Sequence, residues 1–140
     1  MKIVLAVDGS PYTKRMLSYI AAHEELVAPD NEFIALYVTP ELPPHAARFL
    51  PHEALRQYYA DEGEKVLKPV REFAQMQGWP WRERHAVGRP GETLAEIVDA
   101  EKPDLLVMGS HGHGSFTSAL LGSVAGRLLA QTRVPVLLIR

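Results

Sequence analysis

The residues best placed to do chemistry form a glycine-rich segment, Met108-Gly109-Ser110-His111-Gly112-His113-Gly114. Glycine permits positive φ, and it lets backbone amides approach a phosphate with no side chain in between. A helix is expected to begin near Ser123, so its free amides and positive dipole end would point at the same anion. The Ser123 hydroxyl would add a donor or simply cap this helix. The segment therefore predicts a phosphate site, and its glycines alone are equally compatible with a tight turn and nothing more.

A second segment with unusual residues, Val7-Asp8-Gly9-Ser10, follows the first apolar run of the chain. In open parallel sheets, ligands bind beyond the carboxyl ends of the strands, where the strand order reverses. Both segments follow predicted strands, so they are expected at the same rim of the sheet and can face each other. Asp8 is also compatible with a phosphoacceptor, but that chemistry needs neighbouring acids and Val7 and Gly9 flank it. Ser10 is expected to cap a helix, which explains it without a role as nucleophile.

Two histidines and one arginine are weaker candidates. His111 and His113 are compatible with a metal pair, but they have no carboxylate beside them, so we expect loop residues near phosphate or solvent. Arg89 precedes a predicted helix in the turn Arg89-Pro90-Gly91, and we expect it to be solvated, with a phosphate contact as the alternative.

Two common phosphate-binding signatures are absent from the sequence. No Gly-x-x-x-x-Gly-Lys-Ser/Thr segment occurs. The dinucleotide fingerprint would follow the first strand and be followed about 20 residues later by an acid. Here the glycines follow the fourth predicted strand, and no acidic residue occurs after Asp104. Both of these classes of site are therefore excluded.

Alternating strands and helices must position the two segments. Continuous apolar runs with β-branched residues are typical of strands buried on both faces, as in parallel sheets. Such runs predict strands at 2–7, 33–38, 105–108 and 134–139, and a weaker, partly polar strand at 81–87 suits a sheet edge. Helices are predicted from Ser10-Pro11, at 92–102 and at 123–131. This alternation predicts an α/β fold, an open five-stranded parallel sheet with helices on both faces.

The middle of the chain is less regular. Residues 39–51 include four prolines and are predicted to form an irregular excursion. Gly63 and Pro69 lie inside the helix that follows, so we expect a kink or a break into two pieces. Trp79 and Trp81 are expected to cover an edge of the core, with a partner surface as the alternative. Apolar residues at helical spacing predict that helix: Leu55, Tyr59, Val66, Val70 and Phe73.

Length, charge and composition limit the class of protein. The 140 residues suit a single domain, 1–140. Fifteen basic and 17 acidic residues nearly balance, which predicts no attraction to nucleic acid or to anionic membranes. The absence of cysteine excludes disulfides, thiolate catalysis and cysteine zinc sites. The first apolar run meets Asp8 before it reaches the length of a signal-peptide core, and no run is long enough to span a bilayer. We therefore expect a cytoplasmic protein.

The glycine-rich segment resembles the nucleotide-binding branch of the universal stress protein family, which is marked by Gly-x2-Gly-x9-Gly-Ser/Thr. Two residues separate Gly109 from Gly112, and nine residues separate Gly112 from Gly122-Ser123. The opening 7–10, the segment 103–109 and the closing 134–138 are also similar to the family. The resemblance therefore spans the whole chain.

The resemblance implies a Rossmann-like, adenine-nucleotide α-hydrolase-like sheet of order 3-2-1-4-5, with the switch point between strands one and four. It implies binding of ATP, or of ADP or AMP, with or without Mg²⁺ or Mn²⁺. Asp8 would accept hydrogen bonds from the ribose hydroxyls or help hold a divalent ion, Val38 would meet the adenine through its backbone, and Gly109 would touch the ribose. The phosphates would bind at Gly112, Gly122, Ser123 and Val124. The family often has Ser or Thr where this chain has Ala125, so one hydroxyl contact to phosphate is missing. The implied cofactor-binding set is Val7, Asp8, Val38, Met108, Gly109, Gly112, Gly122, Ser123, Val124 and Ala125.

Three functions stay open. The first is a nucleotide-binding regulator in the stress response, because no general base, triad or lysine clamp is visible near the glycine loop. The second is a slow ATPase, or a phosphotransferase that modifies itself on a serine such as Ser110 or Ser123. The third is an interaction protein that binds no nucleotide, which the intact glycine motif disfavours.

The last predicted strand, 134–139, is apolar and would lie at a sheet edge with unpaired amides and carbonyls. Pairing with the same strand of a second copy around a two-fold axis would hide both edges. Pro135 removes one donor but is tolerated at the start of a strand. We therefore expect a homodimer through this strand, and the resemblance implies the same.

Overall fold

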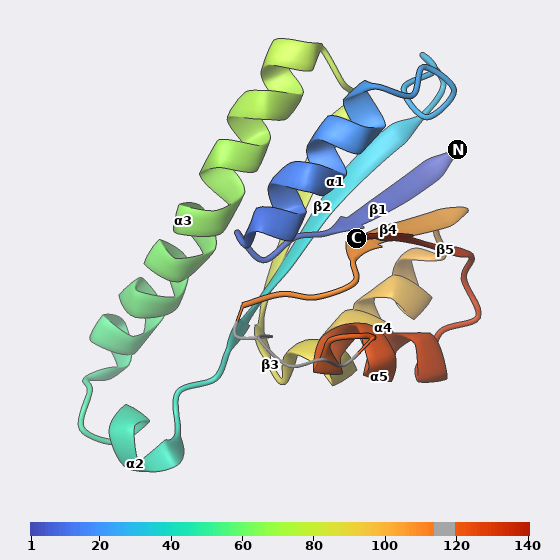
Figure 1. Cartoon of the computed structure of the whole chain (residues 1–140). Coiled ribbons are helices and arrows are strands. Elements are labelled where there is room, and N and C mark those ends of the chain that lie inside the picture. The colour runs from blue at the N-terminus through green and yellow to red at the C-terminus, as the bar shows by residue number, and fades with distance from the viewer. Residues whose placement is uncertain (114–119) are drawn as a thin grey trace.

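The computed structural model describes residues 1–113 and 120–140, and its centre is a parallel sheet of five strands in the order β3-β2-β1-β4-β5 (Figure 1). This confirms the predicted fold class and strand order. The strands are β1 Lys2–Ala6, β2 Glu32–Pro40, β3 Trp81–Gly88, β4 Leu105–Gly109 and β5 Val136–Ile139.

Helices cover both faces of the sheet. On one face α1 and α3 lie side by side, and on the other α4 and α5 do so, as Figure 1 shows. A short helix, α2, lies in the excursion between β2 and α3. The helices are α1 Pro11–Ala21, α2 Pro44–Ala47, α3 His52–Gln77, α4 Pro90–Glu101 and α5 Ser123–Gln131. None of these helices, which account for the helical part of the described chain, has the length and apolar run needed to cross a bilayer.

The central strands are apolar throughout because their side chains feed two separate cores. Successive side chains of a strand point to opposite faces. On β1, Ile3 and Leu5 pack under α1 and α3, whereas Val4 packs under α4 and α5. On β2, Phe33 packs in the core under α1 and α3, and Ile34 packs in the core under α4 and α5. The continuous apolar runs in the sequence therefore follow from burial on both sides.

Of the two alternatives predicted for the long helix, a kink or a break into two pieces, the structure contradicts the break. α3 is one continuous helix of 26 residues, with Pro69 inside it. Proline removes one backbone donor from a helix interior, but the apolar face on either side of it keeps the helix docked on the sheet. Val66, Leu67 and Val70 are all at most 9% exposed. Tertiary packing therefore outweighs the local cost of the proline.

Element boundaries also differ from the predictions elsewhere, most clearly in three places. The excursion contains α2, so it is not irregular throughout. α4 begins at Pro90, because proline is well suited to the first turn of a helix. β5 begins at Val136, not at residue 134; the Val134 amide bonds the Thr132 hydroxyl instead, and Pro135 has no amide hydrogen. Trp79 packs in the core against Phe33, as predicted.

The sheet order creates a crevice next to β1. Ala6 of β1 is paired with Met108 of β4 and with Leu36 of β2. The chain leaves β1 toward α1 on one face, and it leaves β4 toward α5 on the other. The carboxyl ends of β1 and β4 therefore separate into a gap at the point where the strand order reverses, the usual position of a ligand in such sheets.

Gly63 allows α3 to lie close to β3, and this contact generates a stability prediction. A Cβ at residue 63 would lie 2.5 Å from Cε1 and 2.8 Å from Nε2 of His85, and the Thr39 hydroxyl, 2.7 Å from Nε2, holds the imidazole in place. We expect Gly63→Ala to lower the free energy of unfolding by about 1–3 kcal/mol through overpacking. Urea denaturation followed by circular dichroism measures this change.

The matched control is Gly126→Ala in α5, where a Cβ would meet no heavy atom of the described chain within 4 Å. There the helix propensity of alanine should raise the free energy of unfolding by about 0.5–1 kcal/mol. The double variant Gly63→Ala/His85→Ala should recover part of the loss. Equal stability of Gly63→Ala and the wild type would show that the close contact does not constrain the packing.

Candidate functional site

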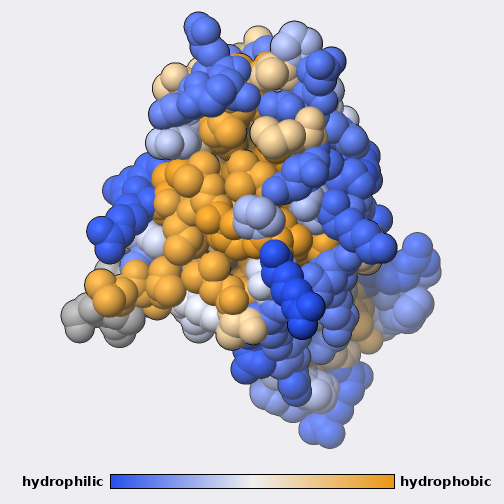
Figure 2. All heavy atoms as spheres, turned by 90° about the vertical axis from the view of Figure 1, so that its right-hand side faces the viewer, coloured by the Kyte–Doolittle hydropathy of each residue, from blue (hydrophilic) through white to orange (hydrophobic). Residues whose placement is uncertain are grey.

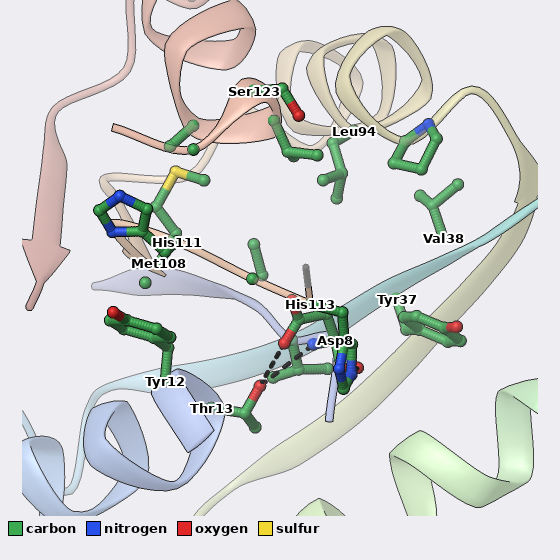
Figure 3. Close-up of a pocket in the computed structure, with 18 of the residues that line it drawn as sticks. Asp8, Tyr12, Thr13, Tyr37, Val38, Leu94, Met108, His111, His113 and Ser123 are labelled. Atoms are coloured by element: carbon green, nitrogen blue, oxygen red, sulfur yellow. Dashed lines mark hydrogen bonds between the residues drawn. The ribbon is translucent and has the colours of Figure 1, made fainter. Parts of the chain in front are cut away.

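A cavity of about 620 Å³ lies beyond the carboxyl ends of β1, β2 and β4 (Figure 3). It is bounded by the turn after β1, the end of β2, the glycine loop after β4 and the first turns of α4 and α5. The structure brings every residue of the predicted nucleotide site to this cavity: Val7, Asp8, Val38, Met108, Gly109, Gly112, Gly122, Ser123, Val124 and Ala125. Segments that are far apart in the sequence therefore form one concave site.

The Asp8 turn is held in place by Thr13. The Thr13 hydroxyl accepts the amide hydrogens of Asp8 and Gly9, at 3.1 and 3.2 Å, and donates to Asp8 Oδ1 at 3.1 Å. The Ser10 amide donates to the same Oδ1 at 2.9 Å. Gly9 has φ of +76°, which glycine adopts readily. The carboxylate is thus fixed through one oxygen, and Oδ2 is directed toward Gly112.

Ser10 stands at the N-cap of α1, as predicted, but its side chain does not cap the helix. Its hydroxyl is buried and has no hydrogen-bond partner among residues 1–113 and 120–140. The Thr13 hydroxyl takes this role instead, because it accepts the hydrogen bonds from the amides of Asp8 and Gly9. The predicted position of Ser10 at the start of the helix is therefore right. The prediction that its side chain caps the helix is wrong.

The glycines of the loop are needed for close approach and not for positive φ. Among the described glycines only Gly9 and Gly78 have positive φ, so that part of the prediction is wrong for Gly109, Gly112 and Gly122. A Cβ on Gly109 would lie 2.6 Å from the Tyr12 Cβ. A Cβ on Gly112 would overlap Asp8 Oδ2, and one on Gly122 would lie 3.2 Å from the His111 Cα. Gly114, the last glycine of the predicted loop, falls outside the described residues.

The start of α5 faces the cavity with its free amides. Gly122 is the N-cap, and its own amide donates to the Ser110 carbonyl at 2.7 Å, which fixes the loop to the helix. The first amides of a helix have no acceptor within it, and they carry the positive end of the helix dipole. Ser123, Val124 and Ala125 are in this first turn and line the cavity. In Figure 3, Ser123 lies across the cavity from Asp8.

Several lining residues were not among the predicted site residues. The first turn of α1 contributes Tyr12 and Thr13, and a signal for them exists, because they follow the capping pair Ser10-Pro11 at the same rim as Asp8. Apolar residues from four other segments had no such signal. The additional lining residues are Ala6, Tyr12, Thr13, Tyr37, Pro40, Pro90, Leu94, His111, His113 and Leu121.

One end of the cavity rests on an aromatic pair. The rings of Tyr37 and His85 are stacked, with centroids 5.7 Å apart and 8° between their planes. Burial raises the pKa of the Tyr37 hydroxyl, and burial lowers the pKa of the His85 imidazole. Both rings are therefore uncharged near neutral pH. They form a flat, neutral support beside Val38.

The weaker candidates lie in different places. His111 and His113 both line the cavity, whereas Arg89 does not: its side chain is 82% exposed and lies 3.6 Å from a Glu92 oxygen. Within residues 1–113 and 120–140 no group of three or more metal-ligating side chains is found. The acidic Asp8 and the two histidines are thus the chemically distinctive side chains of the lining.

The sheet order, the switch-point cavity and the glycine loop against a helix start define a Rossmann-like α/β protein with a cavity at its switch point. The model of the Universal stress protein family matches residues 1–140, and the chain belongs to that family. A universal stress protein of Thermus aquaticus is 31% identical over 139 residues, covering 99% of this chain and 97% of that protein. Universal stress protein MJ0531 of Methanocaldococcus jannaschii is 31% identical over 145 residues, covering 99% of this chain and 81% of that protein.

Solved structures agree with this fold. The structure of MJ0577, a universal stress protein of M. jannaschii, superposes with a TM-score of 0.84 at 25% identity, covering 99% of this chain and 94% of that one. A universal stress protein solved in complex with cAMP gives 0.71 at 24% identity, covering 100% and 97%. An Arabidopsis thaliana family protein with AMP bound gives 0.72 at 17% identity, covering 99% and 90%.

The Thr13 hydroxyl generates a prediction for this site. Thr13→Val keeps the shape but leaves the amides of Asp8 and Gly9 without their acceptor and Oδ1 without one donor. We expect the free energy of unfolding to fall by about 1–3 kcal/mol. Thr13→Ser keeps the hydroxyl and should restore most of it. Thermal and urea denaturation measure both variants; a loss in Thr13→Ser with none in Thr13→Val would mean that the methyl group, not the hydroxyl, stabilises the turn.

Proposed function

We propose that this chain binds an adenine nucleotide in the cavity at the switch point and acts as a regulatory stress-response protein, not as a metabolic enzyme. The observation that carries the proposal is the convergence of the glycine loop, the free amides of α5 and the fixed carboxylate of Asp8 on one cavity. Its volume of about 620 Å³ falls within the usual range for small-molecule and cofactor sites.

The adenine would occupy the end of the cavity next to β2. Val38 and Leu94 are 4% and 6% exposed and form apolar walls there. Figure 3 shows these two side chains together, away from Tyr12 and His111. A flat base gains from apolar contact on its faces and from backbone groups at its edge. The backbone of Val38 at the end of β2 is the proposed partner for that edge.

The ribose would lie beside Asp8. Because Thr13 and Ser10 bond Oδ1, the second oxygen, Oδ2, is the acceptor left for a ribose hydroxyl. The backbone at Gly109 and Gly112 approaches the same region without side chains. Asp8 would thereby fix the orientation of the sugar between the base and the phosphates.

The phosphates would bind at the start of α5, where Gly122, Ser123 and Val124 offer amides and a hydroxyl. ATP accompanied by Mg²⁺ or Mn²⁺ is the form that we propose, because the metal offsets phosphate charge that no lysine in the loop neutralises. Support for the nucleotide class comes from solved family members, of which one holds cAMP, one AMP and a third, from Archaeoglobus fulgidus, dAMP. Adenine, a sugar and a phosphate are common to all three ligands.

Two glycine variants test the proposal. Gly112→Val places a side chain in the space of the Asp8 carboxylate, and Gly122→Val places one against the backbone of His111. Loss of one charge-assisted amide contact costs about 1.5–3 kcal/mol, so ATP binding should weaken by roughly tenfold to a hundredfold or more. Isothermal titration calorimetry with ATP and AMP, with and without Mg²⁺, measures the affinities.

Gly126→Ala is the control, because it changes a glycine of the same helix outside the cavity lining and should leave binding unchanged. Circular dichroism recorded beside each titration verifies folding. Normal nucleotide binding by both folded valine variants would place the site elsewhere, and no heat with any adenine nucleotide would contradict the proposal. Release of ADP under single-turnover conditions would favour the alternative, a slow ATPase or self-phosphorylating protein.

We also propose that two copies pair through β5. Within the described part of the chain this strand pairs with β4 alone, and no described strand covers its other edge. Val136, Leu137 and Leu138 are each only partly buried. Figure 2, which shows the side of the molecule that lies at the right of Figure 1, has a broad apolar surface on this side. A strand edge of this kind with apolar surroundings is suited to pairing with a second copy.

Val136→Pro tests the pairing. The carbonyls of Pro135 and Ile139 bond β4, so the alternate residues Val136 and Leu138 direct their amides to the free edge. Proline at residue 136 removes one edge donor and leaves the bonds to β4 in place. Sedimentation should show the wild type at twice the monomer mass of 15.6 kDa and the variant shifted toward the monomer. A monomeric wild type at micromolar concentration would contradict the dimer.

A further inference from the structure

The glycine loop and the start of α5 contain histidine as their only kind of titratable side chain. Between Asp104 and Arg127 the sequence contains no lysine, arginine, aspartate or glutamate, and its titratable side chains are His111 and His113. Both histidines line the cavity. The other ionisable residues of the described lining are Asp8 and two tyrosines. With neutral histidines, the site proposed for an anionic ligand therefore carries a net negative charge from Asp8.

Neighbouring arginines do not supply the missing positive charge. Arg127 in α5 lies 3.0 Å from one Glu92 oxygen, and Arg89 lies 3.6 Å from the other. Both guanidinium groups are thus paired with the same carboxylate, and neither arginine lines the cavity. The amides at the start of α5 add only about half of a positive charge. A phosphate group needs more than this.

His111 lies beside the start of α5. Its Cα is 3.2 Å from the position that a Cβ of Gly122 would occupy, and its ring packs against Tyr12 with centroids 5.6 Å apart. Its Nδ1 is 3.1 Å from the Ser110 hydroxyl. The backbone of His111 therefore lies against the start of α5, and the residue lines the same cavity as the first turn of that helix.

His113 lies beside Asp8 (Figure 3). Its Nε2 is 2.8 Å from the Asp8 carbonyl oxygen. A carbonyl can only accept, so Nε2 carries the hydrogen and Nδ1 is the nitrogen that gains a proton. This bond fixes the orientation of the ring at the cavity, and because the carbonyl is uncharged it does not form an ion pair with the ring.

We propose that His111 and His113 are the charge-neutralising residues of the site, so that this protein binds its nucleotide phosphate together with a proton. The inference rests on the proposed adenine-nucleotide function. Histidine changes its charge near neutral pH, and a phosphate close to the ring favours the charged form. Nucleotide affinity then rises as the pH falls, and it rises most for ligands with more phosphate charge.

The other charged groups around the two rings keep the same charge when the ligand binds. After β1 the charged group is the Asp8 carboxylate, and on α1 Arg15 lies over the Tyr12 ring at 5.1 Å from its centroid. Tyr37 of β2 is neutral, and on α3 Glu62 and Lys65 pair with each other at 2.9 Å. The bound phosphate is therefore the charge that changes when the ligand arrives.

Cyclic AMP is the probe that isolates the proton taken up by the protein, because a phosphodiester does not titrate near neutral pH. Calorimetry on the full chain at about pH 6 and about pH 8 gives the two affinities. We expect the wild type to bind cAMP roughly threefold to tenfold more tightly at the lower pH. Titrations at about pH 7 in two buffers of different ionisation enthalpy should show proton uptake on binding.

The double variant His111→Gln/His113→Gln keeps polar side chains of similar size and should bind cAMP with little pH dependence and no proton uptake. His23→Gln is the matched control, because His23 stacks on Tyr19 and does not line the cavity; its pH dependence should match the wild type. Equal wild-type affinity at both pH values with no proton uptake would overturn this inference alone, as would full pH dependence in the double variant. Failure of the wild type to bind any adenine nucleotide would overturn the proposed function and this inference with it.

Discussion

The arrangement of the site depends on the direct contact between two strand ends that are 104 residues apart: the carboxylate of Asp8 fills the space that a side chain at Gly112 would need. Thr13 fixes Asp8 from one side, and the bond from the Gly122 amide to Ser110 fixes the loop from the other. Neither segment makes a cavity by itself. The cavity exists because the parallel pairing of β1 with β4 brings these two ends to one rim, and because glycine allows the backbones to approach.

The helices on the two faces of the sheet position different walls of the site. α1, packed with α3, positions the carboxylate wall through Thr13. α5, packed with α4, positions the amides through Gly122. Both pairs of helices rest on cores in which the central strand residues are almost fully buried, such as Leu5 on one face and Leu106 on the other. The two walls are therefore fixed by independent hydrophobic cores on the same rigid sheet.

Much of the fold could be predicted from the sequence, because apolar runs buried on both faces and the alternation of strands with helices are local signals. The continuity of α3 could not, since Pro69 is a local helix breaker whose cost is outweighed by contacts with distant strands. In the site, the spacing of Gly109, Gly112 and Gly122 located the cavity, but the physical need for these glycines is a close approach that only the paired strands create. The position of Thr13 after Ser10-Pro11 was a signal that it lies near Asp8, but the bonds of its hydroxyl to the turn form only when the turn is folded.

The most direct measurement of the central claim is the location of a bound nucleotide by NMR. ¹⁵N-labelled protein titrated with AMP reports on each backbone amide separately. The account predicts that the largest shift changes fall on the amides of Asp8, Gly112, Ser123 and Val124, and that amides at the far end of the sheet, such as those of Asn31 and Asp104, stay unchanged. Saturable changes confined to another surface, or no changes at millimolar AMP, would contradict it.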